Sequence, residues 1–431
     1  MSAYRLFLVV SGVAAFASHT AFTLNIAYQS RVVGLDPLQL ILVGTVMEAV
    51  CFVTQVPTGV LADRYGRRPA VVAGHLLMGT GLLLWGMVPA YAAILAAVVV
   101  WSIGAVCVDG ALQAWAAGEI GEDGTGRAFV RAGQCEQAGM VLGIVAAVAL
   151  TAVGPAVPIV AGGALTLLLG LALAAVMRES PAPCPPSEPA PRPPGEPAPP
   201  PGRRRGGGVL LALVAGSLFA GMSSEGFDRL TQPRLLDDFG LSTTALGGIA
   251  VVAALGAIVV SGRLARYAGT GHPRRLGLLV TGAHAAGAAA VIGFALSGHV
   301  TAAVAYLLAA SLLRTVAGPI LAIWLVSATT PERRATAFSI QAQGDALGQI
   351  AGGPPAGLIA QRAGPAAGIA TAGLFLVPAA ALFLVGALAG RHQGQHRRRG
   401  PPGGVQVQVL SDRAGAQVPA PGSSGRMKVR S

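Results

Sequence analysis

The sequence predicts an all-α membrane protein with twelve transmembrane helices in two pseudo-symmetric six-helix halves. Of its 431 residues, 53% are hydrophobic and only 11% are charged, whereas a soluble domain carries about 25% charged residues. The 60 glycines suit the close packing of helices in lipid. Most of the chain is therefore expected to lie in a bilayer.

Apolar runs of about 20 residues, the length that crosses a bilayer as a helix, recur along the whole chain. The predicted spans are residues 6–28, 38–60, 70–88, 91–117, 128–152, 156–177, 209–230, 242–262, 276–297, 300–326, 335–360 and 366–389. The first run follows Arg5 and contains Ala15 and Ala17, as a signal peptide does. Because it continues to Tyr28 and eleven runs follow, we expect an uncleaved first helix.

An internal repeat divides the chain in two. Four residues recur at an offset of 209 positions: Phe129, Glu136, Gly139 and Gly143 become Phe338, Asp345, Gly348 and Gly352. The predicted organisation is an N-terminal six-helix half (1–177), a Pro- and Arg-rich cytoplasmic linker (178–208), a C-terminal half (209–390) and a disordered basic cytoplasmic tail (391–431).

The distribution of arginine predicts the orientation. Seventeen arginines before the tail fall on one side of the predicted spans, against Arg31, Arg234 and Arg362 on the other. Arginine-rich loops mark the cytoplasmic side, so both termini are expected there and the protein in the cytoplasmic (inner) membrane. The net charge of +12 thus points to topology and lipid headgroups rather than to nucleic acid.

Residue patterns typical of catalysis or cofactor binding are missing from the sequence. There is no CxxC pair, no nucleophile–base pair and no phosphate-binding glycine loop, and the one lysine is Lys428. We therefore predict no enzyme activity, no cofactor and no metal site. His19, His75 and His284 stand alone on apolar helices and are expected to pack rather than to bind ligands.

A short polar hinge, residues 59–69, separates the second and third spans. It resembles the signature loop G-x-L-[AD]-D-[RK]-x-G-R-[RK] of the major facilitator superfamily, and the matching residues are Gly59, Leu61, Ala62, Asp63, Arg64, Gly66, Arg67 and Arg68. The resemblance implies a transporter that works by alternating access around a cavity lined by the first, fourth, seventh and tenth helices. It also implies that the hinge charges form a gate.

Two hypotheses remain open for the role of Asp63. As part of a gate, this carboxylate would bind the N-terminal end of the third helix together with Arg67 or Arg68. Alternatively, the hinge only signals topology. Gly59 and Gly66 are expected to allow close helix approach and a tight turn.

Charged residues inside the predicted spans are the candidate sites for protons or substrate. They are Glu48, Asp109, Glu136, Glu225, Asp228, Arg229, Arg314 and Asp345. A charge in lipid is costly, so each is expected to face the bundle interior and to have a function. A buried carboxylate can be a proton carrier, and Glu48 or Glu136 could each serve.

Two of these groups allow a structural interpretation as well. Glu225, Asp228 and Arg229 share one helix face, either as a local ion pair or as a protonatable site whose arginine is exchanged for a proton or substrate. Arg314 either forms a structural pair with a carboxylate or tunes proton release from it.

The predicted function is proton-coupled efflux of a drug-like or secondary-metabolite compound across the membrane. The hinge, the buried carboxylates and the mostly apolar lining resemble the bacterial drug-efflux branch of the superfamily. Residues 348–357 partly match the glycine–proline motif of that branch, but they lie in the eleventh span, whereas the motif belongs to the fifth, which has no proline here. One alternative is proton-linked uptake of a sugar, amino acid or other metabolite. Another is a non-transporting receptor or scaffold. The expected partners are a small molecule, protons and the lipid bilayer, with the protein as a monomer.

Overall fold

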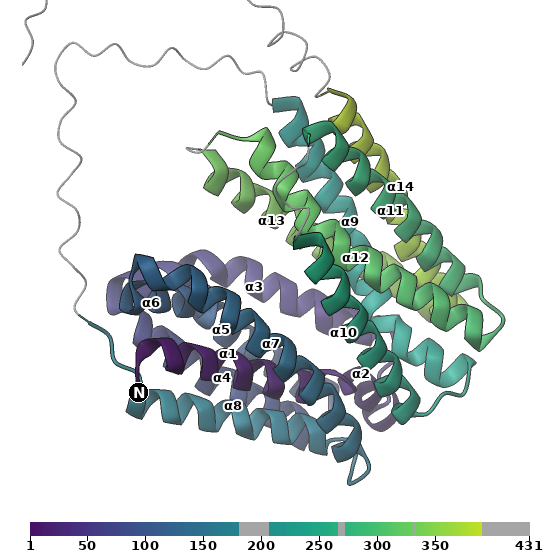
Figure 1. The fold of residues 1–431 in the computed structure, drawn as a ribbon. Coiled ribbons are helices and arrows are strands. Elements are labelled where there is room, and N and C mark those ends of the chain that lie inside the picture. Colours follow the sequence, from purple (N-terminus) through teal and green to yellow (C-terminus); the bar gives the residue numbers. More distant parts are fainter. Residues whose placement is uncertain (181–206, 266–271, 331–332, 390–431) are drawn as a thin grey trace, which may run out of the picture. The chain divides into compact units, whose positions relative to one another are not determined.

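The computed structural model describes residues 1–180, 207–265, 272–330 and 333–389. Most of the predicted linker and all of the predicted tail, 391–431, lie outside the described residues. The described chain is almost entirely helical (Figure 1).

The N-terminal group of helices matches the first six predicted spans to within a few residues. Its elements are α1 (Ala3–Phe22), α2 (Asn25–Tyr28), the π-helical turn η1 (Gln29–Val33), α3 (Pro37–Tyr65), α4 (Arg67–Met87), α5 (Tyr91–Val108), α6 (Ala111–Ile120), α7 (Glu122–Thr151) and α8 (Val157–Val176). Within this group α1 packs on α7 and α8, and α4 packs on α5 and α8.

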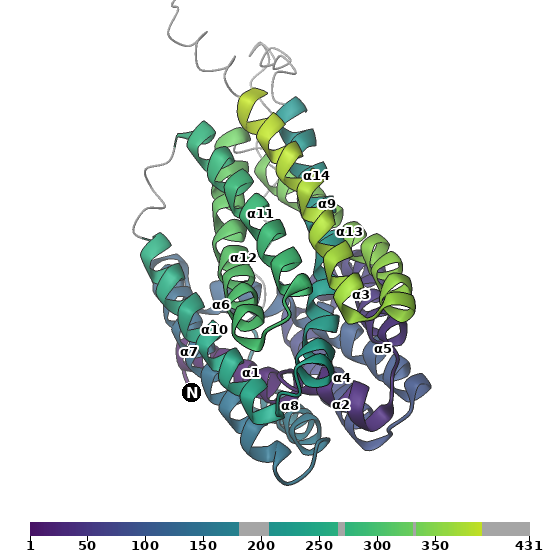
Figure 2. The same cartoon turned by 90° about the vertical axis from the view of Figure 1, so that its right-hand side faces the viewer.

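The C-terminal group matches the remaining six predicted spans. Its elements are α9 (Gly207–Pro233), the π-helical turn η2 (Arg234–Asp238), α10 (Thr243–Ala265), α11 (Pro273–Leu296), α12 (Val300–Ala328), α13 (Arg334–Ala363) and α14 (Pro365–Ala389). Here α9 packs on α13 and α14, and α11 packs on α12 and α14. The two groups meet where α3 contacts α9 and α13 and where α10 lies alongside α7 (Figure 2).

Eleven helical segments in the described residues are long and apolar enough to cross a membrane. α13 is not among them, although its 30 residues are ample in length for a bilayer core about 30 Å thick. Its sequence is rich in Gly, Gln and other polar or small residues, which lowers its hydropathy. Length and composition therefore support eleven spans rather than the predicted twelve.

The predicted repeat has a counterpart in packing. Gly143 of α7 lies against the backbone of Phe16 on α1, and Gly352 of α13 lies against Met222 on α9. A side chain at either glycine would overlap the facing backbone, so equivalent glycines bring equivalent helix pairs together.

The polar hinge is not a loop. α3 runs to Tyr65, α4 begins at Arg67, and only Gly66 separates them, with φ of 101°. Glycine adopts this conformation without the strain that a Cβ would bring, so the expected tight turn falls on Gly66. The close approach expected at Gly59 is wrong for this structure, because a Cβ there would meet nothing within 4 Å.

The fourth predicted span is interrupted. α5 ends at Val108 and α6 begins at Ala111, with Gly110 in a left-handed conformation at φ 76°. Asp109 therefore lies in a helix break and not on a continuous helix face. The break lies within one candidate span, Tyr91–Ile120, where irregular backbone is tolerated only next to protein or a cavity.

Candidate functional site

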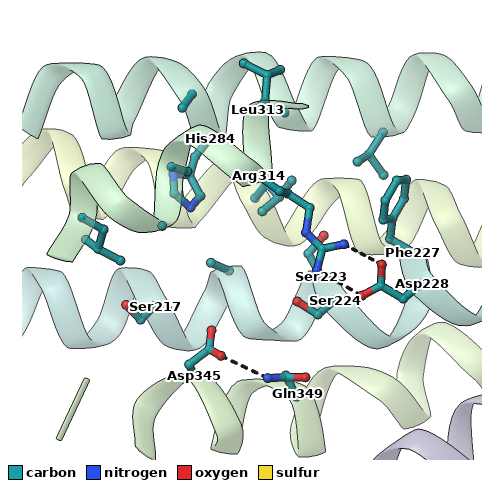
Figure 3. Close-up of a pocket in the computed structure, with 18 of the residues that line it drawn as sticks. Ser217, Ser223, Ser224, Phe227, Asp228, His284, Leu313, Arg314, Asp345 and Gln349 are labelled. Carbon is teal, nitrogen blue, oxygen red and sulfur yellow. Dashed lines mark hydrogen bonds and ion pairs between the residues drawn. The ribbon is translucent and has the colours of Figure 1, made fainter. Parts of the chain in front are cut away.

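A cavity of about 410 Å³ lies among α9, α11, α12, α13 and α14 (Figure 3). Its polar lining residues are Ser217, Ser223, Ser224, Asp228, His284, Arg314, Gln341, Asp345 and Gln349. Apolar residues, among them Phe227, Leu313 and Leu376, form the rest of the wall. Hydroxyl, amide and charged groups that converge in an apolar cavity are typical of a small-molecule site.

Arg314 and Asp228 form the main ion pair of this cavity. Two guanidinium nitrogens of Arg314 donate to the two carboxylate oxygens of Asp228, at 2.6 and 3.0 Å. The guanidinium carbon also lies 5.5 Å from the centre of the Phe227 ring, which adds a cation–π contact. Of the two interpretations of Arg314, the structure displays the pairing, with both side chains facing the cavity (Figure 3).

Asp345 lies across the same cavity. Its carboxylate accepts a hydrogen bond from Nε2 of Gln349 at 3.0 Å and, among the described residues, forms no ion pair. Because Asp228 and Arg314 cancel, the formal charge of the cavity rests on Asp345.

Glu225 and Arg229 form a second pair, which does not line this cavity. The expectation that Asp228 shares one helix face with them is wrong, because Asp228 faces the cavity whereas Glu225 and Arg229 face α3. Nε of Arg229 donates to Glu225 at 3.2 Å, and the two residues are only 5% and 8% exposed. The pair presses on Gly44 of α3, where a Cβ would overlap the Glu225 carboxylate. This is the predicted local ion pair, and it lies at the contact between the two groups of helices.

A second cavity, about 380 Å³, is lined by α3, α5, the Asp109–Gly110 break and α13. Glu48, Asp109 and Asp345 face it from three different elements, together with Phe52 and Trp101. Asp345 thus borders both cavities. The resemblance implied a lining by the first, fourth, seventh and tenth spans, yet α3 and α13, the second and eleventh, also contribute.

Glu136 lies apart from these carboxylates, because it is exposed on α7 and borders none of the three described cavities. A third cavity, about 240 Å³, is lined by His75 and Gln113 and also by Asp109. The ring nitrogens Nδ1 of His75 and of His284 are each 2.8 Å from a carbonyl oxygen one turn earlier, as expected for packed histidines.

At the hinge, the carboxylate that binds the N-terminus of α4 is Glu179, not Asp63. It accepts hydrogen bonds from the backbone N–H groups of Arg67 and Arg68, at 2.8 and 2.9 Å, which suits the positive end of a helix. Asp63 is exposed and, within the described ranges, has no ion-pair partner.

The hinge arginines bind the backbone of other helices. Arg67 donates to the carbonyl of Ala114 at 2.7 Å and Arg68 to that of Ala174 at 2.6 Å. Arg64 lies over the neighbouring Tyr65 ring at 5.6 Å. These bonds join α4 to α6 and α8, so the hinge holds one end of the N-terminal group together.

Sequence analysis did not predict Glu179 or the serines of α9. Glu179 lies just beyond the sixth span, within the first residues of the predicted linker, where no pattern in the sequence marks it. Ser217, Ser223 and Ser224 are spaced so that two turns of α9 face one cavity, a helical periodicity that charged residues nearby concealed.

The contacts between the two groups fall at the helix ends away from the hinge. Gly353 of α13 lies against Thr45 of α3, and Gly357 lies against Leu38. At the hinge end of α3, by contrast, Val53 and Val56 are 69% and 66% exposed. The helices thus separate toward the hinge and touch at the other end.

Two bundled groups of apolar helices that enclose polar cavities define a multi-pass membrane transporter. The chain belongs to the Major Facilitator Superfamily, whose family model matches residues 7–353. It is therefore a secondary transporter, with a small-molecule substrate and a membrane environment. Membership favours transport over a non-transporting receptor or scaffold.

Similar proteins support the same fold. An uncharacterized MFS-type transporter, YxaM of Bacillus subtilis (strain 168), is 27% identical over 114 residues, which cover 26% of this chain and 28% of that relative. A bacterial homologue of the human lysosomal transporter Spinster, in an inward-facing and unoccupied conformation, has a TM-score of 0.71 at 16% identity, covering 93% of this chain and 98% of that one. The nucleoside transporter NupG has a TM-score of 0.66 at 13% identity, covering 91% and 99%.

Proposed function

We propose that the protein exports a drug-like or secondary-metabolite compound in exchange for protons, as the drug-efflux branch of the superfamily does. Residues 1–177 and 209–390 form the two halves that rock about the cavities, joined by the linker at 178–208. The protein works as a monomer in the cytoplasmic membrane, with both termini and the basic tail in the cytoplasm. The hinge residues Gly59, Asp63, Arg64, Gly66, Arg67 and Arg68 gate that side.

α13 is the twelfth span of this proposal. Gln341, Asp345 and Gln349, which lower its hydropathy, line cavities and so avoid lipid. Its contacts with α9 and α3 support a position at the contact between the halves. Polar residues that face a cavity are the ones a spanning helix tolerates.

The observation that carries proton coupling is the position of Glu225. This carboxylate is buried at the contact between α9 and α3, paired only with Arg229 among the described residues. When the halves part at this end, the pair becomes accessible from the other side of the membrane. A carboxylate whose accessibility follows the conformation can bind a proton on one side and release it on the other.

A second group of acids is proposed to bind the substrate or the proton, on the hinge side of the contact between α9 and α3. It consists of Asp345, Glu48 and Asp109. They converge on the cavity that also holds Phe52 and Trp101. Carboxylate and aromatic groups together favour an amphiphilic compound with a positive charge, which is common among drug-like molecules.

A second candidate is proton-linked uptake of a polar metabolite. It is favoured by the hydroxyl and amide groups of Ser217, Ser223, Gln341 and Gln349 in the 410 Å³ cavity. A sugar or amino acid would use these hydrogen-bonding groups more fully than an apolar drug would.

Solute-dependent proton flux in proteoliposomes distinguishes the two candidates. The purified protein is reconstituted with an interior pH dye and an imposed pH gradient, and lipophilic cations, antibiotics, sugars and amino acids are added in turn. Proton movement opposite to a lipophilic compound supports export, whereas movement in the same direction as a sugar or amino acid supports uptake. Asp123→Asn, an exposed carboxylate at the start of α7, is the matched control for variants of the buried acids.

A further inference from the structure

The first span is broken near the end at which the two groups of helices touch. α1 ends at Phe22, and Leu24 leaves the helical region at φ −120° and ψ 15° before α2 begins at Asn25. The carbonyl of Thr23 and the N–H of Ala27, four residues apart, would bond each other in a continuous helix. The break leaves both groups in need of other partners.

The side chain of Gln232 on α9 supplies both partners. Its Oε1 accepts from the N–H of Ala27 at 3.0 Å, and its Nε2 donates to the carbonyl of Thr23 at 2.9 Å. A primary amide offers one acceptor and two donors on one plane. Gln232 therefore replaces one helical hydrogen bond of the first span with two bonds that reach across from the seventh.

Because these backbone groups are buried, they must bond either to Gln232 or to each other. Leu24 and Ala27 are 4% and 5% exposed, and a buried peptide group without a partner is strongly unfavourable. If Gln232 moves away, the most favourable alternative is a direct hydrogen bond from the N–H of Ala27 to the carbonyl of Thr23, which makes α1 and α2 continuous.

We propose that Gln232 positions the first span for the conformational step of transport. Docked, its amide holds α1 broken and the two groups together at this end. Withdrawn, it allows α1 to become continuous as that end opens. We call this pair of hydrogen bonds the Gln232 latch. The inference rests on the alternating access of the proposed function, but not on the substrate or on protons.

A second cross-contact nearby is a weaker candidate for the same role. Arg31 and Asp237 form an ion pair at 2.6 Å, but their side chains are 54% and 49% exposed. Exposed pairs contribute little because water screens them. The Gln232 amide acts on backbone groups inside the structure, so its removal should matter more than loss of the ion pair.

Distances between spin labels test the latch. Val32 and Thr244, both exposed on opposite sides of the contact, are changed to cysteine in a cysteine-free background and labelled. Pulsed electron–electron double resonance then measures the distance between the two labels, in detergent and in nanodiscs, without substrate or a pH gradient. The variants are Gln232→Leu, which keeps size but loses both bonds, and Gln232→Glu, which keeps the acceptor for Ala27. Asp237→Asn is the matched control.

We expect the short-distance population of the parent protein to fall several-fold in Gln232→Leu and less in Gln232→Glu. Asp237→Asn should retain most of it. An unchanged distribution in Gln232→Leu, or an equal loss in Asp237→Asn, would overturn the proposal. If Gln232→Leu does not fold, the graded loss in Gln232→Glu decides in its place.

Amide hydrogen exchange tests the continuous form of α1. In Gln232→Leu, exchange across residues 23–28 should stay slow, because Thr23 then accepts from Ala27. Fast exchange there would mean that the helix stays broken and would refute the two-state part of the proposal. Neither measurement involves transported solute, so failure here leaves export and proton coupling untouched, and the reverse also holds.

Discussion

Arg314 of α12 is held by both carboxylate oxygens of Asp228 on α9, at 2.6 and 3.0 Å, inside a cavity that also contains Asp345. This pairing leaves Asp345 as the acidic group of that cavity without a cationic partner among the described residues. A guanidinium in a two-point pair is also fixed in direction. The position of the unpaired negative charge that a substrate meets therefore depends on whether Arg314 pairs with Asp228 or with Asp345.

Asp228→Asn should neutralise the formal charge of the cavity, because Arg314 then balances Asp345. Arg314 would then turn toward Asp345 or remain unpaired, so the cavity should lose its preference for cations. We expect the transport of a lipophilic cation to fall at least about tenfold, while stability changes by only about 1 kcal/mol, because the pair is nearly half exposed. Flux in proteoliposomes and thermal unfolding measure the two effects.

Asp237→Asn is the control for that variant, since it removes an ion pair of the same length and similar exposure outside the cavities. Equal loss of cation flux in both variants would mean that the Asp228 pair has no special role in charge selection.

Arg314→Lys and Arg314→Ala separate charge from geometry. Lysine keeps the charge but cannot bond both oxygens of Asp228 as the guanidinium fork does, so Arg314→Lys should retain part of the transport rate. Arg314→Ala leaves the half-exposed Asp228 without a partner and should abolish coupling while the protein still folds. The test is flux at matched expression, and wild-type flux in both variants would make Arg314 a spectator.

Asp63→Asn and Glu179→Gln distinguish the gate from the scaffold at the hinge. Glu179 caps α4 here, so Glu179→Gln should lower stability by about 1 kcal/mol. Asp63 is unpaired in this conformation within the described residues, so Asp63→Asn should leave expression and stability intact and slow turnover severely. Melting temperature and flux are measured on the same preparations. Transport by Asp63→Asn at the normal rate would contradict the gate.

The number of spans can be measured by topology. If α13 crosses the membrane, the chain has an even number of spans and both ends lie on one side. Fluorescent-protein and phosphatase fusions after residue 329, before α13, and after residue 363, behind it, should then report opposite sides. The same side for both fusions would rule out α13 as a span, and a fusion after residue 389 that lies outside would point to eleven spans.

Much of this architecture could be predicted from the sequence, because apolar length and arginine placement are local properties. The positions of the apolar helices and the equivalence of Gly143 and Gly352 were predicted from such local patterns. The break at Asp109–Gly110 was not predictable, since a glycine between apolar residues also occurs in continuous helices.

The candidate site was less predictable because its contacts join distant parts of the chain. Sequence spacing indicated that Glu225 could bond Arg229, and it does. It could not reveal that Arg314 takes Asp228, that Glu179 rather than Asp63 binds α4, or that Gln232 enters the break in the first span. Each of these pairs depends on how helices pack and not on spacing along one helix.

Glu225→Gln tests the central claim, proton coupling through a carboxylate buried at the contact between α9 and α3, most directly. Two rates are measured in proteoliposomes with a compound found in the flux screen: accumulation driven by a pH gradient, and exchange of labelled for unlabelled compound without one. The account predicts that Glu225→Gln loses gradient-driven accumulation and keeps exchange, while Asp123→Asn keeps both. Gradient-driven accumulation at the wild-type rate in Glu225→Gln would contradict it.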